Sequence, residues 1–204
     1  MKKALLILGA GGHSSVVTDV AKLQGYSSIF YLDDKKNSQD DNQIIGTCCE
    51  VNKYLKDHDI FVGFGNNEVR KYWITYLKNQ NASIITLIHP SAILGSNVKI
   101  KEGTIIMANA VIQANTIIEE GCIINTAATI DHDCTLQKFT HICPGVHIAG
   151  GVEIKESCWI GIGSSIIQQI SIGKEIMVGA GAVVVENLIE KGTYVGVPAK
   201  KVIR

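Results

Sequence analysis

A repeat of six residues runs without a break from Ile88 to Val184. Every sixth position is aliphatic, and the residue two places earlier is small or apolar. Neither a helix, with a period of 3.6, nor an amphipathic strand, with a period of two, explains this spacing. A parallel β-helix with short flat sides does, because each side needs one inward aliphatic and one inward small residue. The aliphatic positions are Ile88, Leu94, Ile100, Ile106, Ile112, Ile118, Ile124, Ile130, Leu136, Ile142, Ile148, Ile154, Ile160, Ile166, Ile172, Val178 and Val184.

Glycine, asparagine and aspartate recur between these pairs. They adopt unusual backbone angles more easily than other residues, so we expect them at the corners of the coils. The pattern therefore predicts a parallel β-helix for the second half of the chain.

Length and charge set broad limits on the rest. A chain of 204 residues has room for a β-helix and a smaller domain. Nineteen basic residues balance nineteen acidic ones, so charge gives no reason to expect nucleic acid or a membrane surface as partner. The apolar runs are too short for a membrane span or a signal peptide, and we expect a cytoplasmic protein without membrane insertion.

The six cysteines contain no CxxC pair. Cys122, Cys134 and Cys158 fall on inward small positions of the repeat, where a thiol behaves as a small hydrophobic group. We therefore expect reduced cysteines rather than disulfides.

The first part of the chain alternates apolar runs with helical patterns, which is typical of a Rossmann-like βαβ sheet. We expect this domain over residues 1–83, the β-helix over 84–187 and a C-terminal tail over 188–204. The expected elements are a strand at 4–8, a helix at 15–24, strands at 28–32 and 59–64, a helix at 68–78 and a strand at 83–88.

A glycine-rich turn follows the first strand and contains Gly11, Gly12 and His13. A dinucleotide fingerprint would carry a third glycine where this chain has Ser14, but Asp33 follows at the distance that the fingerprint gives its acidic residue. Glycines let a backbone approach a diphosphate at a helix N-terminus. The turn favours a nucleotide site over a plain tight turn, and does not single out NAD.

Gly65 and Asn66 lie at the next turn from strand to helix, on the same carboxyl edge of the sheet. We expect them to contribute to the same site. The alternative is that an asparagine here only caps the helix and that Arg70 is solvated.

Histidines concentrate in one segment of the repeat, at His132, His141 and His147. His132 lies between two carboxylates, and Asp133 could raise its basicity and fix its tautomer, which suits a general base. For His147 a plain surface histidine is the favoured interpretation. A zinc site is the competing hypothesis, but His132 and His141 are half a coil apart, so one ion could bind both only between subunits.

Two small-residue segments, 161–164 and 179–182, lie eighteen residues apart. On successive coils they would leave a groove for an extended ligand, although tight corners alone would also explain each of them.

Taken in order, several motifs resemble the hexapeptide-repeat nucleotide-sugar 4-amino N-acetyltransferases, most closely those acting on UDP-4-amino-4,6-dideoxy sugars in bacillosamine synthesis. The matching motifs are Gly9-Ala10-Gly11-Gly12-His13, Leu32-Asp33-Asp34, Gly65-Asn66-Asn67-Glu68-Val69-Arg70, Asn125-Thr126, Asp131-His132-Asp133-Cys134, Phe139-Thr140-His141 and Gly196-Val197-Pro198-Ala199-Lys200.

The resemblance implies a left-handed β-helix with three hexads per coil, a homotrimer with active sites between subunits, acetyl-CoA as cosubstrate, and no metal. It implies His132 as general base with Asp133 as partner, one methylene shorter than the glutamate expected there. The other implied roles are pyrophosphate binding for Gly11, Gly12 and His13, uracil and ribose contacts for Asp33 and Asp34, a sugar contact for Asn125, a thioester contact for His141, and pantetheine contacts for the backbones of Ile162 and Ala180.

Direct transfer is expected rather than an acyl-cysteine route, because Cys134 belongs to the inward set. Three alternatives stay open: O-acetylation of sialic acid, N-acetylation of a TDP- or GDP-linked amino sugar, and a metal-dependent β-helix protein of the gamma carbonic anhydrase type.

Overall fold

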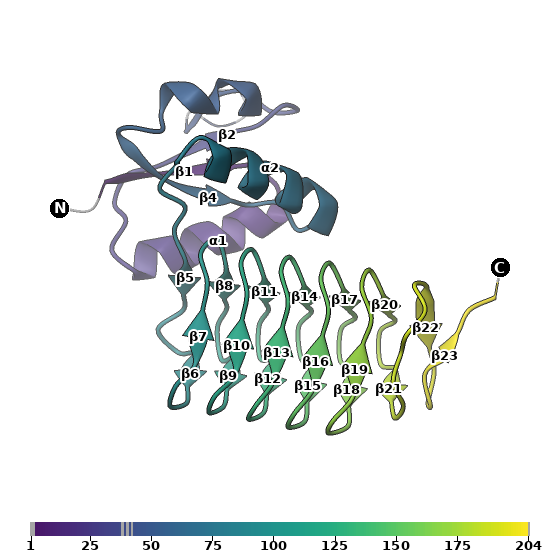
Figure 1. Cartoon of the computed structure of the whole chain (residues 1–204). Helices are drawn as coiled ribbons and strands as arrows, with labels where there is room; N and C mark the ends of the chain where they lie inside the picture. The colour runs from purple at the N-terminus through teal and green to yellow at the C-terminus, as the bar shows by residue number, and fades with distance from the viewer. Residues whose placement is uncertain (1–2, 38, 40, 42, 204) are drawn as a thin grey trace. The chain divides into compact units, whose positions relative to one another are not determined.

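The computed structural model describes residues 3–37, 39, 41 and 43–203. The chain divides into two compact units, one up to Pro90 and one from Ser91 onward (Figure 1). No helix in the described ranges has the length and apolar character that a membrane span requires.

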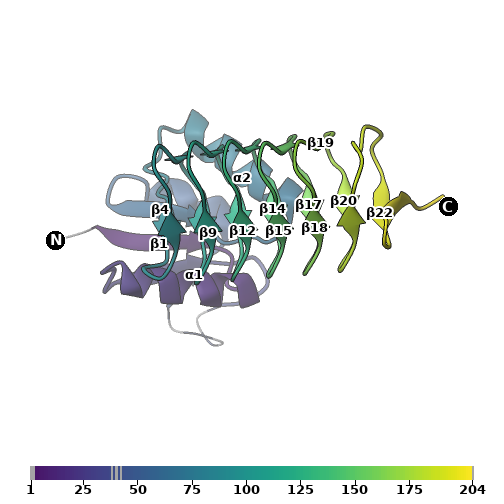
Figure 2. The same ribbon diagram turned by 90° about the horizontal axis from the view of Figure 1, so that it is seen from below.

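The first unit is built on a four-stranded parallel sheet with the strand order β3-β2-β1-β4. Its strands are β1 (Ala4–Leu8), β2 (Ile29–Leu32), β3 (Ile44–Gly46) and β4 (His58–Val62). Helices α1 (Gly12–Leu23) and α2 (Asn67–Asn79) lie on opposite faces of this sheet (Figures 1 and 2). Because both faces are covered, the central strands are apolar throughout, and four of the five residues of β1 are buried.

Some details of the first unit differ from the expectation. Helix α1 begins at Gly12, three residues earlier than predicted, because the glycine-rich turn itself forms the first helical turn, with Gly11 as N-cap. The expected strand at 83–88 is only partly formed: β5 spans Leu87–Ile88, and Ile84 makes an isolated bridge to Ile60. Strand β3 and the 3₁₀ helix η1 (Cys48–Lys53) carried too few patterned residues to be predicted.

Seventeen two-residue strands follow the six-residue repeat, and the second residue of each is the aliphatic position. Parallel pairing joins residues eighteen apart, such as Ile124 with Ile142, so three hexads make one coil. The strands are β5, β6 (Ile93–Leu94), β7 (Lys99–Ile100), β8 (Ile105–Ile106), β9 (Val111–Ile112), β10 (Ile117–Ile118), β11 (Ile123–Ile124), β12 (Thr129–Ile130), β13 (Thr135–Leu136), β14 (His141–Ile142), β15 (His147–Ile148), β16 (Glu153–Ile154), β17 (Trp159–Ile160), β18 (Ser165–Ile166), β19 (Ser171–Ile172), β20 (Met177–Val178) and β21 (Val183–Val184).

The second unit is thus a left-handed parallel β-helix, as predicted, with three flat sides. One side holds β7, β10, β13, β16 and β19, a second runs from β6 to β21, and the third includes β8, β11, β14, β17 and β20. The aliphatic positions point inward, and from Ile106 to Val184 all of them are buried. Corner residues with left-handed backbone angles separate the sides, and many of them are asparagine, aspartate or glycine.

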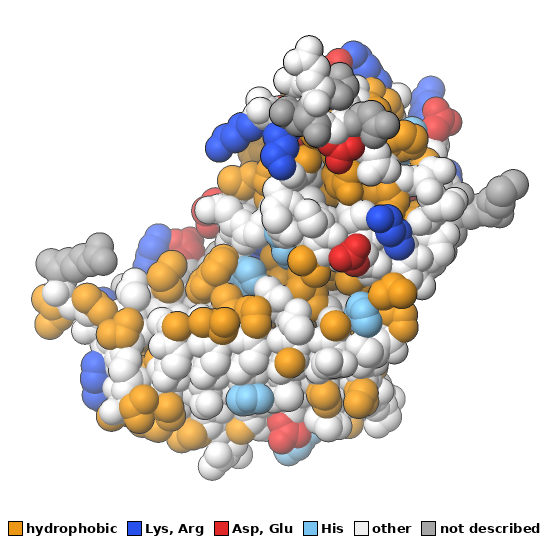
Figure 3. All heavy atoms as spheres, turned by 180° about the vertical axis from the view of Figure 1, so that it is seen from behind, with side chains coloured by type: hydrophobic (Ala, Val, Ile, Leu, Met, Phe, Trp, Pro, Cys, Tyr) orange, Lys and Arg blue, Asp and Glu red, His pale blue; other side chains and the backbone are white. Residues whose placement is uncertain are grey.

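The stack ends with two further strands. β22 (Thr193–Val195) pairs in parallel with β20, and β23 (Lys200–Lys201) runs antiparallel to β22. On the surface of the coils, apolar side chains form rows along the β-helix (Figure 3). Exposed apolar residues of this unit include Ile93, Leu94, Ile162, Ile167, Met177 and Val185.

Candidate active site

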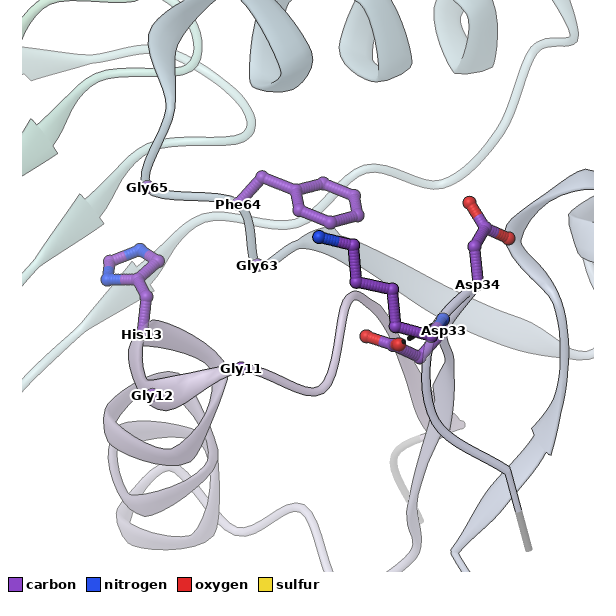
Figure 4. A pocket seen from close by; sticks show the side chains of 9 residues that line it. Gly11, Gly12, His13, Asp33, Asp34, Gly63, Phe64 and Gly65 are labelled. Atoms are coloured by element: carbon purple, nitrogen blue, oxygen red, sulfur yellow. Dashed lines mark hydrogen bonds between the residues drawn. The ribbon is translucent and has the colours of Figure 1, made fainter. Parts of the chain in front are cut away.

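A cavity of about 360 Å³ opens at the carboxyl edge of the first unit's sheet, where α/β proteins bind ligands (Figure 4). The imidazole of His13 and the ring of Phe64 project between the loops that follow β1 and β4. Apart from the adjoining residues of the chain, nothing lies within 4 Å of the position that a Cβ would take at Gly11, Gly12 or Gly65, so a ligand can approach the backbone there. The lining residues are Gly11, Gly12, His13, Asp33, Asp34, Lys35, Gly63, Phe64 and Gly65.

Close packing explains the glycines behind this cavity. Gly9 has a φ of +93°, and a Cβ there would lie 2.9 Å from the ring of Phe64. Ser14 is buried and donates its hydroxyl to the carbonyl oxygen of Gly63 at 3.1 Å. A Cβ at Gly63 would overlap that hydroxyl. In the fingerprint, the third glycine allows the helix to approach the strand closely. Here Gly63, directly after β4, provides the room instead, which allows a serine at position 14.

Asp33 stabilises the glycine-rich turn after β1 through hydrogen bonds to the backbone. Its Oδ2 accepts from the N–H of Ala10 at 2.7 Å, and its Oδ1 accepts from the N–H groups of Lys35 and Lys36. Burial works against ionisation, yet these donors and the Lys36 ammonium lower the pKa of Asp33 below its ordinary value. Asp34 accepts from the N–H of Cys48. Both predicted carboxylates thus line the cavity while also holding its loops.

His13 is largely surrounded by protein. Burial, and then the positive charge of Arg70, lower the pKa of His13 to about 4. The imidazole is therefore neutral at physiological pH and can interact with a ligand as a hydrogen-bonding group rather than as a cation.

Arg70 is only 1% exposed, so the alternative interpretation, in which its side chain is solvated, does not hold. Its guanidinium donates to the carbonyl oxygens of Phe64 and Gly65 and to Oδ1 of Asn67. Asn66 caps α2, because its Oδ1 accepts from the N–H groups of Glu68 and Val69. Gly65 lines the cavity, whereas Asn66 shapes the loop as a helix cap.

In the β-helix, His132 and Asp133 form a hydrogen-bonded pair at the corner between β12 and β13. The Nδ1 of His132 lies 2.7 Å from Oδ2 of Asp133, so the shorter aspartate reaches the ring. This bond, and then the charge of Asp131, raise the pKa of His132. Hydrogen bonds from His132 and Asn115 lower the pKa of Asp133. An ionised Asp133 can only accept, so Nδ1 carries the proton and Nε2 of the neutral ring is free to act as a base.

Asn125 and His141 meet on another side of the β-helix. Asn125 uses its Oδ1 to accept from the N–H of Thr126, so its Nδ2 donates to Nε2 of His141 at 3.2 Å. The His141 ring is 5% exposed and packs against Trp159, with ring centroids 4.2 Å apart. Within this chain the pair is therefore separate from His132, which lies on a corner.

Ile162 and Ala180 are both exposed and occupy the same position on successive coils. A Cβ at the neighbouring Gly161 would lie 2.5 Å from the carbonyl oxygen of Val178, so a tight corner accounts for Gly161. A Cβ at Gly163 or Gly181 would meet nothing within 4 Å. The surface beside Ile162 and Ala180 is therefore open to an extended ligand.

Within the described ranges, no group of three or more histidine, cysteine, aspartate or glutamate side chains is placed to hold a metal ion. Cys134 is buried and directs its Sγ toward the carbonyl oxygen of Ala149. Burial raises the pKa of the Cys134 thiol, and raises that of Cys143 to about 11.

Comparison with known proteins gives two family models, the PglD N-terminal domain over residues 4–77 and the bacterial transferase hexapeptide (six repeats) over residues 97–132. The solved acetyltransferase domain of PglB from Neisseria gonorrhoeae FA1090, in complex with acetyl coenzyme A, is 38% identical. The match covers 99% of this chain and 100% of that one, with a TM-score of 0.95. The chain belongs to the PglD-type acetyltransferases.

Two further relatives of this PglD-type chain are named with different nucleotides, GDP in one and UDP in the other. A mutant of perosamine N-acetyltransferase from Caulobacter crescentus, solved with CoA and GDP-perosamine, is 30% identical, covers 98% of this chain and 97% of its own, and has a TM-score of 0.91. UDP-N-acetylbacillosamine N-acetyltransferase from Bacillus subtilis (strain 168) is 35% identical over 112 residues. That alignment covers 52% of this chain and 52% of the relative, so the match spans about half the length of the curated relative.

Several residues at these candidate sites were not predicted. Lys35, Gly63 and Phe64 line the cavity, and Asn115 and Gly150 contact the His132–Asp133 pair from neighbouring coils. Asn115 lies eighteen residues before Asp133, and Gly150 eighteen after His132, so the coil length was the signal that could have found them.

Proposed function

We propose that the chain is an acetyl-CoA-dependent N-acetyltransferase acting on the 4-amino group of a UDP-linked 4-amino-4,6-dideoxy sugar, by direct transfer with His132 as general base. The observation that carries the proposal is the His132–Asp133 pair, whose geometry leaves Nε2 of the neutral ring unprotonated and able to accept a proton. The 59% exposure of the His132 side chain gives a substrate access to that nitrogen.

The chemistry that this pair can perform fits the transfer. The amine nitrogen forms a bond to the thioester carbonyl carbon, and Nε2 of His132 takes up the amine proton. The bond from carbon to sulfur then breaks, and the departing thiolate accepts a proton, so that an amide and free CoA result. Asp133 stabilises the imidazolium that forms. A base placed in this way contributes a factor of about 10² to 10⁴.

The cavity of the first unit supports the nucleotide part of the proposal. This cavity combines open glycine backbone at the N-terminus of α1 with the neutral His13 and with Lys35. We assign the diphosphate to Gly11, Gly12 and His13, with Gly65 beside His13, and the uridine to the side with Asp33 and Asp34 (Figure 4). UDP is proposed on the resemblance to the bacillosamine enzymes, and GDP, the nucleotide bound by the Caulobacter relative, is the nearest alternative.

In the β-helix we assign the sugar to Asn125, the thioester to His141 and the pantetheine arm to the backbones of Ile162 and Ala180. The exposed apolar side chains of this unit support a homotrimer, with sites between neighbouring subunits. We also propose a cytoplasmic location, where nucleotide sugars and acetyl-CoA would both be available.

The test is thiol release from acetyl-CoA with UDP-4-amino, TDP-4-amino and GDP-4-amino sugars and with sialic acid, each with wild type and with His132→Ala. His147→Ala is the matched control, because His147 is also an exposed histidine of the repeat and bonds only to Thr129 among the contacts found for it. We expect turnover on the UDP sugar that falls at least a hundredfold in His132→Ala alone.

Turnover on sialic acid alone would overturn the nucleotide assignment and favour O-acetylation. No turnover on any acceptor, together with bound zinc in the purified protein, would favour the metal-dependent alternative.

A further inference from the structure

A row of hydrogen-bonded side chains leads along one corner of the β-helix to the proposed base. Asn97, Asn115 and Asp133 occupy the same corner on three successive coils, with φ values of +59°, +63° and +57°. Nδ2 of Asn97 lies 3.1 Å from Oδ1 of Asn115, and Nδ2 of Asn115 lies 3.1 Å from Oδ1 of Asp133. The next corner in the row is Gly151, which has no side chain to continue it. The row therefore ends at the carboxylate that contacts His132.

The carboxylate fixes the direction of every bond in the row. Asp133 is ionised and can only accept, so the amide of Asn115 must present its NH₂ group to it. The Oδ1 of Asn115 then faces Asn97 and accepts from it. On the other side, Oδ2 of Asp133 accepts from Nδ1 of His132. The amide of Asn115, itself aligned by Asn97, thus holds one carboxyl oxygen of Asp133, while His132 holds the other.

The length of Asp133 makes this arrangement possible. Its short side chain lies over its own corner, where one oxygen reaches the adjacent ring and the other reaches the asparagine of the coil before. Asparagine suits position 115 for two reasons: it tolerates the left-handed backbone there, and its amide donates and accepts at once.

We propose that Asn115, supported by Asn97, is a positioning residue that locks the Asp133 carboxylate in the rotamer that orients His132. The proposal rests on the proposed function, in which His132 is the base. Without Asn115 the exposed carboxylate can rotate about χ1 and χ2, and the ring then loses both its partner and its fixed tautomer.

Within the part of the chain that the structure describes, the groups found around the His132 side chain come from its own coil and from the coils before and after it. Asp131 and Asp133, from its own coil, supply the charge that acts on it. The coil before contributes the neutral Asn115 through Asp133, and the coil after contributes Gly150. Removing Asn115 changes no charge, so any change in the titration of His132 reports the position of Asp133.

The test compares Asn115→Gly with Asn109→Gly. Both replace an exposed corner asparagine with positive φ, and glycine accepts that backbone, but Asn109 lies outside the row. The titration of the His132 ring is followed by ¹⁵N NMR, with its signals assigned by their loss in His132→Ala. In Asn115→Gly we expect the pKa of His132 to fall by on the order of half a unit or more and the share of the Nε2–H tautomer to rise. We expect kcat to fall about tenfold with KM for acetyl-CoA unchanged, while Asn109→Gly matches wild type.

Asn97→Gly is the second variant, because it leaves Asn115 in place but frees its amide, and we expect a smaller shift in the same direction. An unchanged His132 titration in both Asn115→Gly and Asn97→Gly would overturn the proposal. The NMR result does not depend on turnover. If the titration of His132 shifts in Asn115→Gly but His132→Ala remains active, the positioning role of Asn115 is supported and the role of His132 as base is rejected.

Discussion

The imidazole of His132 lies over the backbone of Gly150, the residue at the matching position of the next coil. A methyl group at Gly150 would lie 2.7 Å from both Cε1 and Nε2 of the ring. These are the atoms nearest to the proposed site of proton transfer. The missing side chain at position 150 therefore leaves room for the orientation in which Asp133 holds the ring.

Gly150→Ala is expected to displace the His132 ring without unfolding the coil. The backbone angles at Gly150 do not require glycine, and the exposed imidazole can swing away from the new methyl group. A displacement of about 1 Å at a catalytic group can cost on the order of a hundredfold in rate, so kcat should fall tenfold to a hundredfold. The matched test is a double-mutant cycle with His132→Ala, measured by thiol release. Additive losses in the cycle would show that Gly150 acts on something other than His132.

The pH profile of kcat/KM should distinguish the effect of nearby charge on the pKa of His132 from the effect of Asp133 on the orientation of its ring. The raised pKa of His132 means that its imidazolium persists above the ordinary value of 6.5, so the acid limb of kcat/KM should lie above that value. Asp131→Asn removes a charge but keeps the Nδ1 bond to Asp133, and should move the limb to lower pH with a modest loss of kcat. Asp133→Asn should also move the acid limb to lower pH. In addition, the new amide can donate to Nδ1 and reverse the tautomer of His132, so kcat at high pH should be at least about tenfold below that of Asp131→Asn. Equal kcat values for the two variants would contradict the assigned roles.

Arg70→Lys should loosen the loop that lines the nucleotide cavity. A lysine ammonium cannot reproduce the three hydrogen bonds of the buried guanidinium, and unsatisfied carbonyl oxygens cost about 1–3 kcal/mol of unfolding free energy. Because two of the acceptors belong to Phe64 and Gly65, we also expect weaker binding of UDP by calorimetry. Asn66→Ala is the control, since it removes the helix cap at a cost of about 1 kcal/mol and leaves those carbonyl contacts in place. An unchanged UDP affinity in Arg70→Lys would separate this loop from the nucleotide site.

Thiol labelling should find one reactive cysteine in the native protein. Cys49 is the exposed thiol, and the other five are buried. Burial is the main cause that raises the pKa of Cys48 to about 12 and that of Cys158 to about 11, which suppresses the reactive thiolate. Ellman's reagent should therefore titrate one thiol per native chain and six after denaturation, and Cys49→Ser should abolish the native signal. More than one native equivalent would reopen an acyl-cysteine route.

The β-helix could be predicted almost completely because one inward aliphatic position per side is a strict requirement of its geometry. Seventeen repeats in the sequence became the seventeen strands from β5 to β21. The first unit was less predictable at its edges. There, β3 has only three residues, and the glycines before His13 gave no sign that they begin a helix.

The site was predictable where its parts are neighbours in the sequence, as with His132 and Asp133. It was missed where contacts arise from the stacking of coils, as with Asn115 and Gly150. An asparagine or glycine is expected at a corner for backbone reasons alone, so neither residue indicated a site. The sequence also left the environment of Arg70 open, because two of its three acceptors are the backbone carbonyl oxygens of Phe64 and Gly65, which no sequence pattern identifies.

The final strand, β23, has a consequence for solubility. A stack of parallel coils presents its last strand as an open row of peptide groups, on which another chain could add and grow into a fibre. β23 lies against β22 in the opposite direction, and its two lysines form ion pairs with Glu186 and Glu190. A reversed, charged strand of two residues is a poor template for pairing. β23 therefore disfavours the addition of another chain to this edge of the β-helix.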